Sequence, residues 1–195
     1  MNLFLWGALP YIAFTFLIVG TLVRFFYFER NWTTKSSEFL EKKQLRIANP
    51  LFHFGLLCVI GGHVVGVLVP KAWTAALGIN DHMYHEGALY MGAVAGIIFI
   101  VGFLLLMKRR FTVPAMKVNT SGLDKWLYLF LTLAIFSGMA GTLLNASGFF
   151  DYRVSIGPWF RSLLSFMPDP SLMEGVPFMF KFHMLAWMVV AIIFP

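Results

Sequence analysis

Three of the five histidines in the sequence lie inside long apolar stretches. His53 and His63 fall in the second such stretch, and His183 falls in the fifth. An ionisable side chain at membrane depth is costly unless it is paired or bound to a ligand, so each is a candidate functional residue. One membrane histidine is explained equally well by a hydrogen bond between helices. Three of them on two helices favour a common role in binding a cofactor.

The positions of these histidines along their helices predict one facing pair. At about 1.5 Å per residue, His63 lies roughly 15 Å beyond His53. His183 follows about two turns after the start of a helix that runs in the opposite direction, so we expect it at the depth of His63. Two imidazoles that face each other across a bundle can be the axial ligands of a haem iron. His53 and His63 differ by about 80° around their helix and can serve two haems, but not one shared iron.

Glycines near the histidines agree with a flat cofactor. Gly55, Gly61, Gly62 and Gly66 flank the two histidines of the second stretch, where a macrocycle needs residues without side chains. Close packing of helices through small residues is the alternative explanation. The sequence contains no C-x-x-C-H motif, so a haem would be non-covalent and of b type. Zinc is disfavoured because it usually takes three or four convergent ligands.

The composition is that of an integral membrane protein. Of the 195 residues, 59% are hydrophobic and 12% are charged, and the mean hydropathy is +0.76. A soluble domain carries roughly 25% charged residues. The single cysteine allows neither a disulfide framework nor an iron–sulfur cluster held by this chain alone. The net charge of +6 arises mostly from two basic loops, and no nucleic-acid-binding module is present.

Five apolar stretches are long enough, or nearly so, to cross a hydrocarbon core of about 30 Å. We therefore predict an all-α integral membrane protein, a single domain over residues 1–195 built as a bundle of five transmembrane helices. The first and third loops are rich in Lys and Arg, which places the N-terminus outside and the C-terminus in the cytoplasm. The predicted spans are residues 3–28, 50–69, 87–107, 123–146 and 176–195.

Two of the connecting segments have features of their own. The polar stretch 31–49 is expected to contain a short cytoplasmic helix that starts near Thr34 or Ser37. Residues 147–175 include Trp159, Phe160, Phe166 and three prolines, and we expect a part of this segment to lie at the membrane interface.

Short segments spread over almost the whole chain carry a family resemblance. In order and spacing they resemble the gamma subunit of respiratory nitrate reductase, the membrane cytochrome b of that complex. Membrane cytochromes of sulfite-reduction-associated and heterodisulfide-reductase-like complexes share much of the pattern and form the alternative. The segments are residues 50–55 (PLFHFG), 61–66 (GGHVVG), 104–110 (LLLMKRR), 120–124 (TSGLD) and 175–183 (GVPFMFKFH).

The resemblance implies two b haems stacked across the membrane. His63 and His183 would bind the outer haem, and His53 would be one ligand of the inner haem. In the family, the second ligand of the inner haem lies further along the fifth helix, beyond a Phe-Pro pair like residues 194–195. We therefore expect this chain to be truncated at its C-terminus.

The implied function is oxidation of a quinol, menaquinol or ubiquinol, at the outer face of a prokaryotic cell membrane. Electrons would pass inward to an iron–sulfur beta subunit and a molybdenum-containing catalytic alpha subunit. Candidate residues for the quinol site are His85 and Glu86, because a histidine or carboxylate can accept a quinol proton. Gly62 and His63 would also border this site. For His85 and Glu86, a merely solvated interfacial position is the alternative. Two alternatives to the electron-transfer function are a transporter with a histidine proton relay and a structural membrane anchor.

Overall fold

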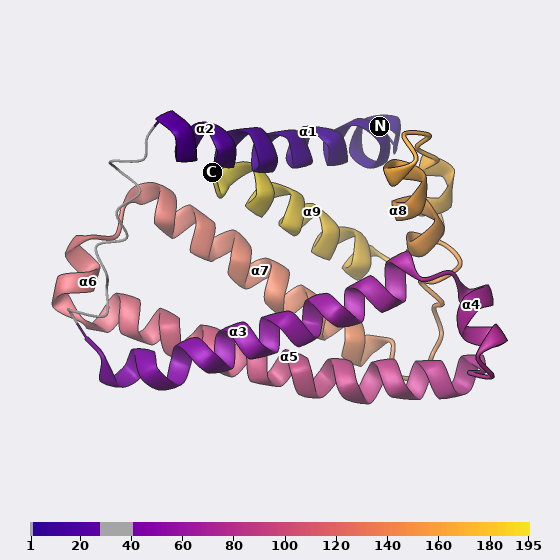
Figure 1. Ribbon diagram of the computed structural model, residues 1–195, viewed down its shortest axis with the longest axis horizontal. Coiled ribbons are helices and arrows are strands. Elements are labelled where there is room, and N and C mark those ends of the chain that lie inside the picture. The colour runs from indigo at the N-terminus through magenta and orange to yellow at the C-terminus, as the bar shows by residue number, and fades with distance from the viewer. Residues whose placement is uncertain (1, 28–40) are drawn as a thin grey trace.

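The computed structural model describes residues 2–27 and 41–195, and these residues form helices and connecting turns without a β-strand (Figure 1). The predicted all-α class is thereby confirmed for this part of the chain. In order, the elements are η1 (Phe4–Ala8), α1 (Leu9–Thr15), η2 (Phe16–Gly20), α2 (Thr21–Tyr27), α3 (Lys43–His63), η5 (Val64–Leu68), α4 (Lys71–Ala76), α5 (Asp81–Thr112), α6 (Pro114–Val118), α7 (Gly122–Leu144), α8 (Ile156–Leu164), η6 (Pro170–Met173) and α9 (Phe178–Ile193).

Four continuous helical stretches are long and apolar enough to cross a membrane. They are Phe4–Tyr27 with 24 residues, Lys43–Leu68 with 26, Asp81–Thr112 with 32 and Gly122–Leu144 with 23. The last long helix, α9, is equally apolar but has 16 residues, which corresponds to about 24 Å. Four of the predicted spans are thus confirmed as helices of spanning length, and the fifth span stays a prediction.

Two helices begin earlier than the apolar stretches suggest. α3 starts at Lys43 and continues through Pro50, which was predicted as the start of the span. Proline removes one backbone hydrogen bond, but helices in membranes tolerate it because neighbouring groups compensate. The cytoplasmic helix expected near Thr34 and Ser37 would begin outside the described residues, and its C-terminal part, residues 43–49, is the first part of α3 itself.

α5 begins at Asp81, six residues before the predicted span. The side chain of Asn80 caps it by accepting a hydrogen bond from the backbone N–H of Met83 at 2.8 Å. His85 and Glu86 therefore lie on the first two turns of a helix rather than in a loop, which corrects the sequence-based assignment. Their positions on the helix fix the directions of their side chains.

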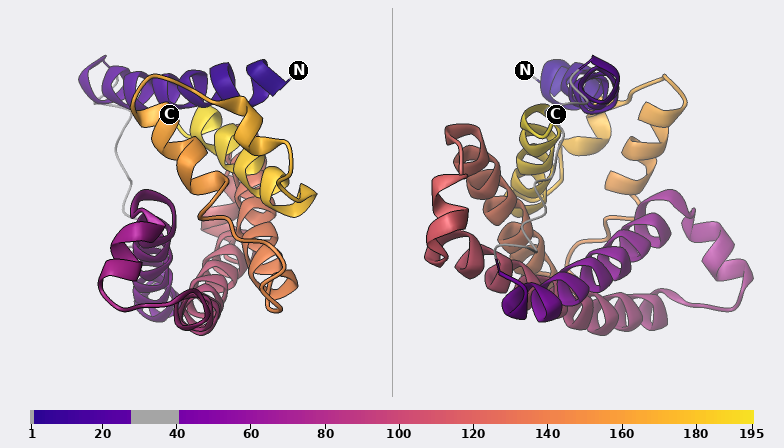
Figure 2. Two further views of the ribbon diagram at one scale, coloured as in Figure 1. Left: turned by 90° about the vertical axis from the view of Figure 1, so that its right-hand side faces the viewer. Right: turned by 60° about the vertical axis from the view of Figure 1, so that its left-hand side comes forward.

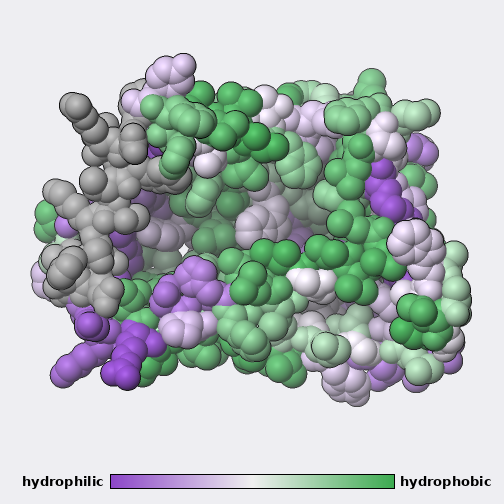
Figure 3. Space-filling view, in the orientation of Figure 1, coloured by the Kyte–Doolittle hydropathy of each residue, from purple (hydrophilic) through white to green (hydrophobic). Residues whose placement is uncertain are grey.

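The long helices pack in two groups (Figures 1 and 2). α3 lies along α5, and α7 lies along α9, with α1 and α2 on the far side of α9. Within the described ranges, α3 makes no extensive contact with α1 or α9. The space-filling view shows a hollow between the band formed by α1 and α2 and the band formed by α3 and α5 (Figure 3).

Contact between α3 and α5 depends on two glycines. A Cβ on Gly55 would lie 2.5 Å from the backbone nitrogen of Phe99, and a Cβ on Gly102 would lie 2.3 Å from that of Phe52. Both distances are far below van der Waals contact, so the two helix backbones touch at these positions. Gly55 thus serves helix packing rather than the cofactor surface that the sequence suggested, as small residues commonly do in membranes.

The outward faces of the helices are apolar. Large hydrophobic side chains such as Phe26, Met91 and Leu123 are 68%, 76% and 72% exposed. Figure 3 shows hydrophobic residues over much of the surface and a hydrophilic patch near the start of α3. In a bilayer these side chains would face lipid, and the helical backbone satisfies its own hydrogen bonds there.

Two ion pairs lie at the end of the bundle where α3 starts and α6 is located, and one of the four side chains, that of Arg109, is buried. The guanidinium of Arg109, 4% exposed as a side chain, contacts the carboxylate of Glu41 at 2.9 Å. Arg110 contacts Asp124 at 3.2 Å and lies over the ring of Tyr128. These two residues of the basic third loop thus have carboxylate partners within the chain, in addition to their value as an orientation signal.

Candidate cofactor-binding site

The structure brings His63 and His183 together. His63 is the last residue of α3, at the end that leads to α4, and His183 lies in the second turn of α9, which follows α8. Their ring centroids are 6.0 Å apart and their ring planes differ by 26°. The two histidines expected at similar depth are therefore within contact distance of each other, with their rings stacked.

Backbone carbonyls fix the orientation of both rings. The Nδ1–H of His63 donates to the carbonyl of Val59 at 2.7 Å, and that of His183 donates to the carbonyl of Ala134 on α7 at 2.8 Å. A carbonyl oxygen can only accept, so in the neutral ring the proton lies on Nδ1 and Nε2 presents a lone pair. Metal-binding histidines commonly use this second contact to hold the ring in place.

The two rings, 6.0 Å apart between centroids, are close enough to belong to one binding site. No group of three or more His, Cys, Asp or Glu side chains that could hold a metal ion occurs in residues 2–27 and 41–195. Two histidines alone would therefore suit a group that brings further ligands of its own, as the macrocycle of haem does.

Glycine on α7 makes room for His183. A Cβ on Gly138 would lie 2.7 Å from Cε1 of the His183 ring, so a larger residue would displace the imidazole. On the α3 side, Gly61 and Gly62 have no atom within 4 Å of a would-be Cβ. The predicted open surface is therefore present at Gly61 and Gly62, whereas Gly55 and Gly66 lie against other parts of the chain. Gly138 was not predicted from the sequence to belong to the site. The only signal for it there is a small residue within an apolar stretch.

His53 is separate from this pair and closer to the other end of α3. Its Nδ1–H donates to the carbonyl of Asn49 at 2.9 Å, which leaves Nε2 with its lone pair, as in the other two membrane histidines. Within the part of the chain that the structure describes, no second histidine faces it. His53 thus has the orientation of a ligand, but its opposite side is open to another group.

The two remaining candidates, His85 and Glu86, lie on α5. His85 lies beside Gly148, and its Nε2–H donates to the carbonyl of Ala146 at 3.1 Å. No hydrogen bond in the described residues joins His85 or Glu86 to His63. The structure therefore separates the quinol-site candidates into a group at the histidine pair, Gly62 with His63, and a group at the start of α5.

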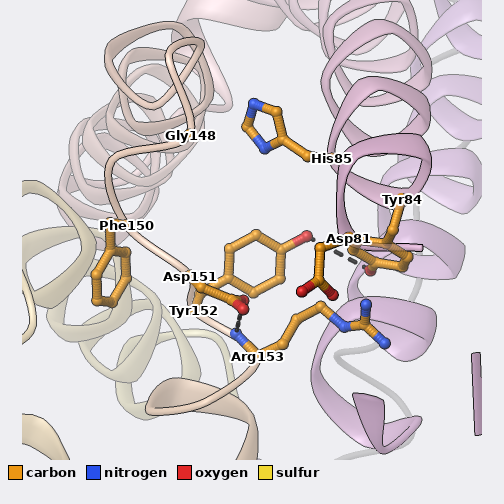
Figure 4. Close-up of a pocket in the computed structure, with 8 residues that line it drawn as sticks. All are labelled: Asp81, Tyr84, His85, Gly148, Phe150, Asp151, Tyr152 and Arg153. Carbon is orange, nitrogen blue, oxygen red and sulfur yellow. Dashed lines mark hydrogen bonds between the residues drawn. The ribbon is translucent and has the colours of Figure 1, made fainter. Parts of the chain in front are cut away.

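His85 lines a pocket of about 260 Å³ between the start of α5 and the segment after α7 (Figure 4). In this pocket the hydroxyl of Tyr152 donates to that of Tyr84 at 3.4 Å. Burial, and then the hydrogen bond to Tyr84, raises the pKa of Tyr152, so its hydroxyl stays protonated. Asp81 and the buried Arg153 complete the polar wall. The sequence signal for this pocket was the Asp-Tyr-Arg run at 151–153 within an otherwise aromatic loop.

The fold and site define a helical membrane protein in which histidines from two helices lie ring to ring, each with its Nδ1 hydrogen-bonded to a backbone carbonyl. The family model for the nitrate reductase gamma subunit matches residues 2–195. This chain belongs to that family, as the five short segments of the sequence indicated. Membership fits a membrane subunit of a respiratory nitrate reductase, an oxidoreductase complex.

Several relatives are similar over nearly the whole chain. The nitrate reductase gamma chain of Bacillus subtilis is 47% identical over 98% of this chain and 86% of its own length. The respiratory nitrate reductase 1 gamma chain of Escherichia coli is 27% identical over 100% of this chain and 87% of its own. The nitrate reductase-like protein NarX of Mycobacterium tuberculosis is 37% identical, and the chain spans 30% of its length.

Proposed function

We propose that this chain is the haem b-binding, quinol-oxidising membrane subunit of a respiratory nitrate reductase. The observation that carries the proposal is the pair His63 and His183, with ring centroids 6.0 Å apart and both Nδ1 atoms bound to carbonyls. Such a pair is suited to hold a haem iron. When bound, haem would supply one-electron transfer, which no side chain of this site provides.

The residues of the chain would position the cofactor. The carbonyls of Val59 and Ala134 hold the imidazoles in the ligand tautomer. Gly138 allows His183 to approach α7, and Gly61 and Gly62 leave the α3 wall flat. His53, with the same Nδ1 orientation, would contribute one ligand to a second haem nearer the cytoplasmic side.

The proposed orientation places the quinol on the outer side. The basic first and third loops would be cytoplasmic, so the N-terminus, α4 and α8 would lie at the outer face and α9 would be the fifth span. His85 and Glu86 on α5, and Gly62 with His63 on α3, are the proposed quinol-site residues. A quinol releases two protons when oxidised, and an imidazole or carboxylate at this end could accept them.

The partners follow from the same proposal. An iron–sulfur beta subunit and a molybdenum-containing alpha subunit would receive the electrons at the cytoplasmic face of the prokaryotic cell membrane. Quinol oxidation outside, with electrons moving inward, separates charge, and one charge moved across 100 mV corresponds to about 2.3 kcal/mol.

A reduced-minus-oxidised visible spectrum of the purified complex tests the proposal. We expect the α band of a b-type cytochrome, reduced by added menadiol and reoxidised by nitrate. A preparation that lacks this band but contains intact subunits would contradict the haem assignment. A histidine proton-relay transporter, the alternative class, predicts no such band and no menadiol oxidation.

A further inference from the structure

The pocket between α5 and the segment after α7 has a polar wall that binding a cofactor at His63 and His183 does not require. Arg153 is 4% exposed, and its Nε atom is buried without a hydrogen-bond partner in the described part of the protein. Its guanidinium lies 3.7 Å from the centroid of the Tyr84 ring and donates to the hydroxyl of Thr74. A pocket of about 260 Å³ has room for several waters, each of which takes about 30 Å³ in the liquid.

This pocket begins close to the helix that carries His63. Gly66 lies in η5, about one turn after His63. A Cβ on Gly66 would lie 3.0 Å from the Tyr152 ring and 3.2 Å from the Tyr84 hydroxyl. The two tyrosine hydroxyls therefore touch the backbone just past the histidine pair. Figure 4 shows them pointing toward each other across the pocket, with His85 on one side and Asp81 and Arg153 on the other.

Carboxylates form the solvent-facing rim of the pocket. The ammonium of Lys71 contacts Asp81 at 2.8 Å and Asp151 at 3.0 Å, and these side chains are 69% and 40% exposed. Hydrogen bonds to Asp81 and then Asp151 raise the pKa of Lys71, so it stays charged. Together with Arg153, it balances the charge of the two carboxylates. Arg161 of α8, the other nearby cation, donates to the carbonyl of Val67 at 2.7 Å.

We propose that this pocket is the outlet through which protons released by quinol oxidation reach the water outside. The inference rests on the proposed function and assigns a role to the groups around Tyr84, Tyr152 and Asp81. Polar groups continue from the turn after His63 to exposed carboxylates, whereas the surrounding helices are apolar and offer protons no path. The two cations balance the two carboxylates around the pocket, and the pocket has room for water. These features suit the passage of protons better than the binding of an ion.

The proton path can be followed atom by atom. The Nε2–H of His85 is held by the carbonyl of Ala146, so Nδ1 has the lone pair that accepts a proton from a quinol hydroxyl. The proton then passes through the Tyr84–Tyr152 pair, in which each hydroxyl accepts one proton and releases its own, and pocket water links this pair to His85 and to the rim. Asp81 receives the proton and becomes a carboxylate again when the proton enters bulk water. The electrons leave by the separate, haem-bound route.

Menadiol oxidation by the assembled complex in membranes tests the outlet. The variants are Tyr84→Phe, Tyr152→Phe and their combination. Tyr90→Phe is the matched control, because Tyr90 lies on the same helix and is 64% exposed away from the pocket. We expect the double variant to lower kcat at least about tenfold. This is less than the roughly 10²-fold loss of rate expected when a general base is removed, because water partly replaces the hydroxyls. KM should stay unchanged, and the kinetic effect of D₂O should increase.

Asp81→Asn is a second variant. The side chain of Asp81 is exposed, so we expect its replacement to cause only a small folding defect. Glu174→Gln is the matched control for the loss of a carboxylate. The Asp81→Asn variant should also lower kcat and leave KM unchanged. A raised KM with unchanged kcat would mean that the pocket binds the quinol headgroup and would overturn the outlet. Rates equal to those of the controls would overturn it as well. The α band of each preparation is recorded separately, so absence of haem counts against the proposed function and not against the outlet.

Discussion

The imidazoles of His63 and His183 lie 6.0 Å apart between ring centroids, although they come from α3 and α9, whose backbones make no extensive contact within the described residues. The Nδ1–H of each ring donates to a backbone carbonyl. For His63 this carbonyl lies on its own helix, and for His183 it lies on α7. Three helices thus hold the pair in place. Preorganisation of this kind lowers the ordering cost of binding.

Replacing either histidine of the pair should remove the same haem. If His63 and His183 hold one haem together, as proposed, His63→Ala and His183→Ala should each lower the haem content by one per chain, because each variant lacks one of the residues that would hold it. Haem extraction together with circular dichroism measures the loss and the retained helix content. His82→Ala, on the exposed side of α5, is the control and should keep full haem. Full haem content in both pair variants would rule out this ligand assignment.

Enlarging Gly138 should disturb the site without removing a ligand. Gly138→Val would place side-chain atoms where the His183 ring lies, since even a Cβ is 2.7 Å from Cε1. The ring would rotate away from the carbonyl of Ala134 and lose its alignment with His63. We expect a shifted or weakened haem spectrum. Gly122→Val, on the same helix but with open space around its Cβ, should leave the spectrum unchanged. Equal spectra for both variants would show that α7 does not position His183.

The glycines of α3 should differ in their effect on stability. Gly55→Ala is expected to destabilise the protein by about 1–3 kcal/mol, because its Cβ would overlap the Phe99 backbone and force α3 away from α5. Gly61→Ala, which meets open space, should be neutral or stabilising by up to about 1 kcal/mol through helix propensity. Thermal unfolding in detergent compares the two. The reverse order would contradict the close contact of α3 and α5.

Low pH should weaken the ion pair between Glu41 and Arg109 of α5. A hydrogen bond from the backbone N–H of Gln44, and then the Arg109 guanidinium, hold the pKa of Glu41 below its ordinary value of 4.5. A carboxyl with a depressed pKa in the folded state stabilises the fold above its unfolded pKa and loses this contribution as the pH falls through the folded pKa. The difference in Tm between wild type and Glu41→Gln should therefore be largest above pH 4.5 and shrink below it. A difference that grows with acid would refute this.

The length, composition and depth of the helices could be predicted from the sequence. Apolar runs of about 20 residues specify membrane helices, and counting residues along antiparallel helices placed His63 opposite His183. The family resemblance rested on segments around the same residues. Helix ends were predicted less well, because polar residues such as Asp81 and Lys43 extend helices beyond the apolar core.

Only the tertiary structure decided how each helix is rotated about its axis. In lipid, an outward Leu and an inward Leu lie in similarly apolar surroundings, so hydropathy carries little information on which face packs. Close backbone contacts decide it instead: Gly55 meets Phe99, and Gly138 meets His183. The pocket around Tyr84 and Arg153 likewise required folding, because it joins the start of α5 to a loop that follows α7. Residue spacing set the depth of the histidines, and helix packing turned them toward each other.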